Sequence, residues 1–217
     1  MSDLTPYQHE QLDALELSIL YLKGLTPKAR AQLNASIEPY LDFRVEVDAF
    51  LKMNFSRYCT HSCYTAQTSA CCSRDGIITF WADVLINANA SDRQQLERLQ
   101  HAISNPLNRK KCIYLGPDGC IWRVRPLVCA MFVCDDALAM AFEGSTEAEC
   151  QWEEFKHQAK GFRWPDRPVL FDQLEKRCIA AGVESPLMYL HSSPGLLRIK
   201  RKAGLTLPLH KKDGKKI

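Results

Sequence analysis

The sequence has no apolar run long enough to cross a membrane. Its longest apolar stretch, residues 126–134, ends at Asp135 and Asp136, whereas a membrane-spanning helix needs about 20 residues. The first residues, MSDLTPYQHEQLDALEL, have neither the basic nor the apolar region of a signal peptide. We therefore expect a cytoplasmic protein with no membrane partner.

Local signatures of several enzyme classes are also missing. The sequence contains no P-loop, no GxGxxG, no HExxH and no GxSxG. These motifs cradle phosphates, bind dinucleotides, hold catalytic zinc or present a nucleophilic serine. Nucleotide-dependent and hydrolytic chemistry therefore have no local support.

Cysteine, in contrast, is plentiful, with ten residues in 217. In a reducing compartment, clustered cysteines more often bind metal or perform redox chemistry than form disulfides. Cys71 and Cys72 are adjacent and could pair with one another only in a strained ring. Eight cysteines form two groups of four, which we predict to be metal ligands: Cys59, Cys63, Cys71 and Cys72, then Cys112, Cys120, Cys129 and Cys134.

The spacing of the second group leaves the number of metal centres open. In a regular hairpin turning at residues 117–119, Cys112 and Cys120 would lie about 13 Å apart along the strands at ~3.3 Å per residue. Cys129 and Cys134 are five residues apart, which places them well apart around one helix. Either this helix breaks near Phe132, or two centres share the eight thiols.

The surroundings of Cys129 favour a deprotonated thiol. Cys129 falls in the first turn of a helix expected after Pro126, where backbone N–H groups without helical partners favour negative charge. Arg123 and Arg125 add positive charge nearby. These features lower a thiol pKa, as metal binding requires.

Helical periodicity surrounds the cysteine groups. Apolar residues recur at helical spacing over residues 8–23, 40–55 and 168–181, with Pro39 expected to kink or restart the second helix. Further helices are predicted after Gly76, from a Ser91/Gln94 cap to Ser104, and from a Thr146/Glu149 cap. Strands at 112–115 and 120–124 flank a Gly-Pro-Asp-Gly turn.

The predicted fold class is therefore mainly α with a small β-hairpin, and an irregular cysteine-rich metal-binding core packs between helices. We divide the chain into an N-terminal helical segment, a cysteine-cluster core, C-terminal helices of the same domain and a basic tail, at residues 1–58, 59–134, 135–195 and 196–217.

The cysteine pattern resembles that of the YkgJ-type cysteine-cluster family, described as zinc- or iron-chelating. The resemblance covers residues 59–134. It rests on the Cys71-Cys72 doublet and on a second half matched by Cys112, Leu115, Gly119-Cys120, Arg125-Pro126 and Cys129. The upstream spacing differs, because C-x3-C-x7-C-C replaces the C-x2-C-x2-C-C of the family. The resemblance implies metal binding.

Thiolate ligands suit both an iron–sulfur cluster and zinc. The adjacent cysteines favour a polynuclear iron–sulfur cluster, with electron transfer or redox sensing as its use and an unidentified redox or protein partner. One alternative is an enzyme that uses such a cluster for oxidoreduction or methyl transfer. The other is a zinc-stabilised interaction module that binds through the basic tail.

The remaining features have simpler interpretations. Cys150 and Cys178 fall in helical patterns, so we expect both to be buried as small apolar residues. Residues 196–217 contain eight Lys or Arg and one Asp, which would suit nucleic acid. The tail has no aromatic residue for base stacking, and we expect it to be solvated. Asp135 and Asp136 are expected to form an exposed helix start, with an acid/base pair as the alternative.

Overall fold

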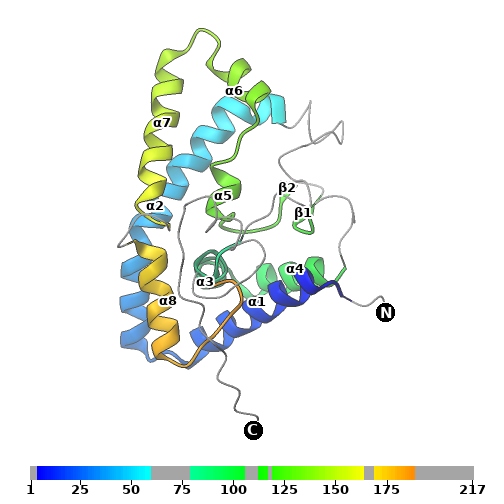
Figure 1. Cartoon of the computed structure of the whole chain (residues 1–217), viewed down its shortest axis with the longest axis vertical. Coiled ribbons are helices and arrows are strands. Elements are labelled where there is room, and N and C mark those ends of the chain that lie inside the picture. Colours follow the sequence, from blue (N-terminus) through cyan, green and yellow to red (C-terminus); the bar gives the residue numbers. More distant parts are fainter. Residues whose placement is uncertain (1–3, 60–78, 106–111, 117–118, 164–168, 189–217) are drawn as a thin grey trace, which may run out of the picture.

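A computed structural model of the chain describes residues 4–59, 79–105, 112–116, 119–163 and 169–188. The described part is mainly helical, as predicted (Figure 1). Its elements are α1 (Pro6–Gly24), α2 (Pro27–Tyr58), α3 (Trp81–Ala90), α4 (Arg93–Ser104), β1 (Leu115–Gly116), β2 (Gly119–Cys120), α5 (Leu127–Ala130), α6 (Asp135–Phe142), α7 (Thr146–Lys160) and α8 (Leu170–Ala180). No helix in the described part is long and apolar enough to span a membrane.

The long helix α2 runs the length of the molecule, and α7 and α8 lie along it (Figure 1). Aromatic side chains fill this contact. Phe50 stacks on Trp152 of α7, with ring centroids 5.9 Å apart, and Tyr40 meets Phe171 of α8 edge-on at 5.7 Å. Such pairs add to the hydrophobic gain from burying large rings, so they fix the α7–α8 pair against α2.

Helix α3 occupies the centre of the fold. Every residue from Trp81 to Ala88 is buried, and α3 contacts α1 on one side and α8 on the other. A helix that is buried on all sides is hydrophobic all round, which explains the dense apolar sequence after Phe80. The polar exceptions, Asp83 and Asn87, are one helical turn apart and therefore share a face.

Helix boundaries mostly follow their capping residues. Thr26 accepts the backbone N–H of Ala29, and Pro27 is the first residue of α2, as predicted. Two predicted caps were wrong by one residue. Asp92 with Gln95 caps α4 in place of Ser91 with Gln94, and Ser145 caps α7 in place of Thr146. Asp is an N-cap as good as Ser, so sequence alone did not separate the two registers.

Pro39 was predicted to kink or restart the helix; α2 continues through it, so there is no restart at this residue. Proline removes one hydrogen bond from the helix interior. Ile37, Tyr40 and Phe43, on both sides of Pro39, are buried in the same hydrophobic core. Tertiary packing of this face outweighs the local cost, as it commonly does in helices of folded proteins.

The region between α4 and α6 is irregular. Leu115 pairs with Cys120 and Gly116 with Gly119 in antiparallel register, which is shorter than the strands predicted at 112–115 and 120–124. Pro117 and Asp118 lie outside the described residues. After α5, the chain leaves the helix at Met131 and re-enters one with Cys134 as the N-cap of α6. The helix therefore breaks at the predicted place, and Cys129 and Cys134 do not share it.

Candidate metal centre

Five of the eight predicted ligands lie in the described part of the chain. Cys59 ends α2, Cys120 is in β2, Cys129 is in α5 and Cys134 caps α6, while Cys112 precedes β1. All five are half-buried, and no disulfide joins the described cysteines to one another. The other three predicted ligands, Cys63, Cys71 and Cys72, lie outside the described residues.

Three of these cysteines lie within electrostatic range of Tyr7, which is half-buried with a buried hydroxyl, or of the buried Tyr114. Burial raises the pKa of Tyr7 far above its usual value, and negative charge on Cys112 or Cys129 raises it further. Burial likewise raises the pKa of Tyr114, to which Cys112 and Cys120 contribute. The backbone N–H of Tyr114 also donates to the Cys112 sulfur at 3.4 Å. Segments that are distant in sequence thus bring three thiols within electrostatic range of one aromatic pair.

The two tyrosine hydroxyls have different hydrogen-bonding. The Tyr114 hydroxyl donates to Oε1 of Gln11, which also accepts the hydroxyl of Thr79 at 3.0 Å. The Tyr7 hydroxyl lies near that of Tyr114, but it is buried without a hydrogen bond of good geometry. Burying a hydroxyl without a hydrogen-bond partner costs free energy. An acceptor close to the Tyr7 hydroxyl would remove this cost.

Two more buried donors resemble the Tyr7 hydroxyl in their hydrogen bonding. Nε1 of Trp122 and Nε2 of Gln11 are buried without a hydrogen-bond partner in the described part of the chain. Trp122 packs edge-on against Tyr114, with ring centroids 5.1 Å apart, and Gln11 is one helical turn from Tyr7 on α1. Sequence patterns did not point to Tyr7, Gln11 or Tyr114, because only the fold brings α1 to the cysteines.

Helix α3 braces the chain that carries Cys129. Oδ1 of Asp83 accepts the backbone N–H of Leu127 at 2.9 Å, and its Oδ2 accepts that of Phe80 at 3.0 Å. One turn further on, Oδ1 of Asn87 accepts the backbone N–H of Val124 at 2.9 Å. The two buried side chains therefore fix residues 124–127 to the centre of the fold.

Helix α2 braces the same segment from the other side. Arg44, which is buried, donates to the backbone carbonyl of Arg125 and to the Tyr40 hydroxyl at 3.2 Å. The Arg125 guanidinium pairs with Asp48 at 3.4 Å. The Arg-Pro pair of the sequence motif is thus an anchor between α2 and α3, and it sets where Cys129 lies.

These contacts change part of the prediction for Cys129, because some of the groups expected to favour a negative charge on its thiol have other partners. The Leu127 N–H, at the start of α5, is taken by the carboxylate of Asp83. Arg125 is paired with Asp48, and Arg123 is exposed. Asp83 itself is buried, and this burial raises its pKa to about 6, against the hydrogen bonds from Leu127 and Phe80 that lower it.

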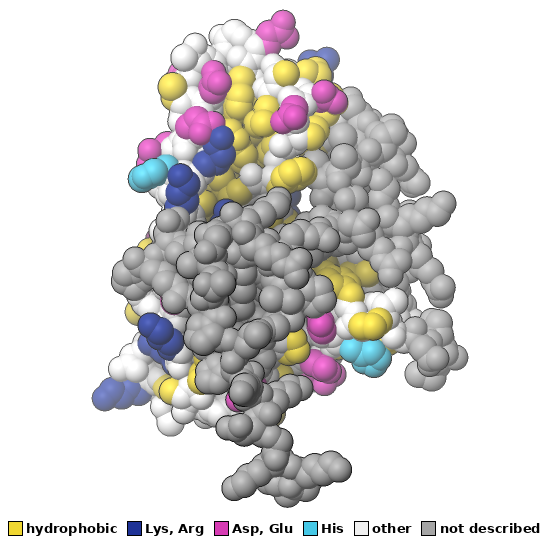
Figure 2. All heavy atoms as spheres, viewed as in Figure 1, with side chains coloured by type: hydrophobic (Ala, Val, Ile, Leu, Met, Phe, Trp, Pro, Cys, Tyr) yellow, Lys and Arg dark blue, Asp and Glu magenta, His cyan; other side chains and the backbone are white. Residues whose placement is uncertain are grey.

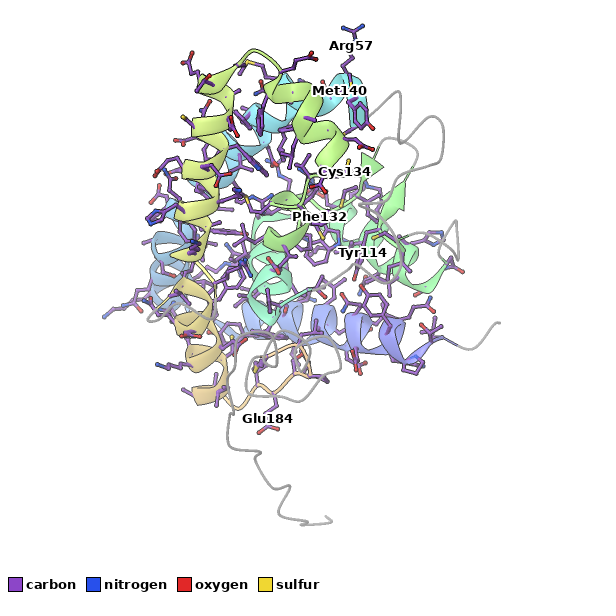
Figure 3. The ribbon with its side chains drawn as sticks, turned by 45° about the horizontal axis from the view of Figure 1, so that its top comes forward. Arg57, Tyr114, Phe132, Cys134, Met140 and Glu184 are labelled. Atoms are coloured by element: carbon purple, nitrogen blue, oxygen red, sulfur yellow. The ribbon has the colours of Figure 1, made fainter. Side chains whose placement is uncertain are left out.

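Within the described ranges, no three His, Cys, Asp or Glu side chains form a ready ligand group for a metal ion. Figure 3 shows Cys134 at the start of α6, above Tyr114 in that view. The described thiols therefore do not by themselves form a complete set of ligands for a metal ion.

The two cysteines that we assigned to packing differ from one another. Cys178 is fully buried, and burial raises its thiol pKa, which hydrogen bonds with Trp81 and Tyr21 lower in part. This confirms its place in the core. Cys150 lies exposed on α7, so its predicted burial was wrong: the apolar face of α7 is made by Ala148, Trp152 and Phe155, and Cys150 points away from it.

Comparison of the chain with known protein families, with curated proteins and with solved structures found no match.

Proposed function

We propose that the chain binds an iron–sulfur cluster through its clustered cysteines and uses it in electron transfer or redox sensing. In this proposal residues 59–134 form an irregular cysteine-rich core held between helices, with the ligands drawn from Cys59, Cys63, Cys71, Cys72, Cys112, Cys120, Cys129 and Cys134. The resemblance to the YkgJ-type cysteine-cluster family belongs to the same proposal.

The observation that carries the proposal is that Cys112, Cys120 and Cys129 come close enough to Tyr7 and Tyr114 to raise the pKa of one or both tyrosines, and that the Cys112 sulfur accepts the backbone N–H of Tyr114 at 3.4 Å. These cysteines come from three separate segments, whose positions depend on α1, α2 and α3. A core that needed only small apolar residues there would not require thiols, whereas thiolates are the ligands that iron–sulfur clusters and zinc bind.

The buried donors support the same interpretation. Among the described residues, the Tyr7 hydroxyl has no hydrogen bond of good geometry and the indole N–H of Trp122 has no hydrogen-bond partner. Metal-bound thiolates carry negative charge and accept hydrogen bonds, which also tune the potential of a cluster. Donors that are orphaned and buried beside thiols therefore fit a bound thiolate centre better than they fit an apolar core.

When bound, an iron–sulfur cluster supplies one-electron redox chemistry. The residues described here would act on the ligands and their surroundings. Asp83 and Asn87 hold the backbone on which Cys129 is placed. Tyr114 and Trp122 keep the site poor in water through burial, and low solvent access is one of the protein's means of setting a cluster's potential.

Metal analysis of protein purified without oxygen tests the proposal. We expect iron and acid-labile sulfide in whole-number ratios to the chain, with visible absorption that bleaches on reduction. Zinc without sulfide would replace the cluster with the zinc-stabilised interaction module. A chain that folds equally well without metal, even after reconstitution with iron and sulfide, would reject both.

A further inference from the structure

An exposed apolar patch lies beside Cys134. Phe132 is 56% exposed and Met140 is 61% exposed, values that are high for side chains of this size. Figure 3 shows both along one face, with Cys134 between them. Figure 2 shows hydrophobic side chains gathered over this part of the molecule, with several acidic and some basic side chains at their margin. We call Phe132 and Met140, with this surrounding surface, the α6 patch.

The rim of the α6 patch is acidic. On α6 and its C-cap, Asp136, Met140 and Glu143 follow one another at i, i+4 and i+7, so they share one helix face. Asp135 adds an exposed carboxylate in the first turn. Between Leu127 and Phe155 the chain has seven Asp or Glu residues and no Lys, Arg or His. Arg57, exposed at the end of α2, lies beside Met140 in Figure 3, so the excess of negative charge is that of residues 127–155. An apolar patch on a stretch with this excess is complementary to an apolar segment that carries positive charge.

The chain contains such a segment at its C-terminal end. Residues 196–217 hold eight Lys or Arg against one Asp. Between the basic runs RIKRK and HKK lies LTLPL, in which Leu205, Leu207 and Leu209 alternate with other residues. In an extended chain, residues two apart point to the same side, and the proline disfavours a helix here. The segment therefore carries three leucines for one face and basic residues on both flanks.

The chain is long enough to bring this segment to the α6 patch. Leu187, near the last described residue, accepts the N–H of Trp81 with its carbonyl, which fixes the end of the described chain at α3. In Figure 1, α8 and α6 lie at opposite ends of α2. The 32 residues of α2 span about 48 Å, whereas the 17 residue-to-residue steps from Met188 to Leu205 reach up to ~56 Å.

We propose that the C-terminal segment 196–217 docks on the α6 patch of its own chain, with its leucines against Phe132 and Met140 and its basic residues against the acidic rim. This replaces the solvated tail that composition alone predicts. The docking itself does not depend on the proposed metal centre.

Cross-linking of the full-length chain tests the contact directly. A zero-length carbodiimide reagent joins Lys to Asp or Glu in contact, and mass spectrometry locates the joined residues. We expect links from Lys211 or Lys212 to Asp135, Asp136 or Glu143 within one chain, lost at high salt because exposed ion pairs are screened. Links from these lysines only to acids elsewhere, or none to the rim, would overturn the proposal.

A competition experiment separates docking from chance proximity. A fluorescent peptide of residues 196–217 is titrated with two full-length proteins, the unchanged chain and a variant with Leu207→Ser, Lys211→Glu and Lys212→Glu. The tethered segment competes at a high effective concentration, so the peptide should bind the variant at least tenfold more tightly. Equal binding to both proteins would exclude docking within the chain.

Two further variants assign the surface. Phe132→Ser with Met140→Ser, made in the variant with the altered tail, should weaken peptide binding at least tenfold. Leu20→Ser is the matched control, because Leu20 is 67% exposed on α1, and it should leave binding unchanged. If Leu20→Ser and the patch variant behave alike, the α6 patch is not the site. Sedimentation that shows dimers through the tail would place the segment on a second copy and would overturn docking in the same chain.

Discussion

Asp83 on α3 accepts the backbone N–H of Leu127 at 2.9 Å, which ties the centre of the fold to the short helix that carries Cys129. The residues are 44 positions apart in sequence. The same carboxylate caps its own helix by accepting the N–H of Phe80. One buried side chain therefore stabilises two helix starts, one of them next to a predicted metal ligand.

Replacing Asp83 with Ala should destabilise the protein by about 2–4 kcal/mol, because two buried backbone donors lose their acceptor. Urea denaturation measures the change. Asp92→Ala is the matched control, since Asp92 caps α4 with an exposed carboxylate, and it should cost about 1 kcal/mol. Equal losses in the two variants would show that Asp83 acts only as a local cap.

The pH dependence of the free energy of unfolding should reflect the raised pKa of Asp83. Its pKa is raised by burial from 3.8 to about 6 in the folded state. Between these values the folded protein holds a proton that the unfolded chain has released, so the free energy of unfolding falls as pH rises through about 6. The stability of the natural chain relative to Asp83→Asn should fall by on the order of 2 kcal/mol from about pH 4 to pH 7. A pH-independent difference would contradict the raised pKa.

The cysteines should separate into ligands and bystanders when metal is measured per chain. Cys129→Ser, Cys120→Ser and Cys72→Ser should lose metal, because a hydroxyl is a poor replacement for a thiolate. Cys150→Ala should keep full metal and stability, since Cys150 is exposed on α7. Cys178→Ala should keep full metal with a packing loss of about 1 kcal/mol. Full metal in Cys129→Ser, or metal lost in Cys178→Ala, would show that the ligands are wrongly assigned.

The two tyrosines near the cysteines should respond differently to loss of their hydroxyl groups. Tyr114→Phe removes a hydrogen bond to Gln11 and should cost about 1 kcal/mol or more in metal-free protein. Tyr7→Phe removes a buried hydroxyl that has no well-formed hydrogen bond to the described residues, so the metal-free stability should change by less than about 0.5 kcal/mol. A larger loss for Tyr7→Phe than for Tyr114→Phe would mean that its hydroxyl has a protein acceptor.

The aromatic contact between α2 and α7 should dominate the stability of that end of the molecule. Trp152 is buried and touches both Phe50 and Phe55. Trp152→Ala should therefore destabilise the protein by about 3–5 kcal/mol, measured by thermal or urea unfolding. Leu20→Ala, on an exposed position of α1, should stay within about 0.5 kcal/mol of the natural chain. A small loss at Trp152 would mean that α7 is not held by this stack.

The sequence by itself determined which segments are helical and which residues have the chemistry of metal ligands. Apolar spacing and capping residues are local signals, and they predicted α1, α4, α7 and α8 to within a few residues. The break between Cys129 and Cys134 was one of two alternatives that the sequence left open, because residues five apart lie well apart around one helix. The cysteine ligands and the Arg-Pro pair could be predicted because these residues lie close together in the sequence.

The tertiary structure alone decided which side chains meet. Tyr7 and Gln11 sit about a hundred residues from Tyr114, and only the packing of α1 brings them to the cysteines. Arg44, Asp83 and Asn87 looked like ordinary helix residues, yet they hold the segment that positions Cys129. Burial also separated Cys178 from Cys150, because both have helical neighbours but only one lies on the face that packs. Long-range contacts depend on which faces of distant elements pack together, and local sequence patterns do not specify that pairing.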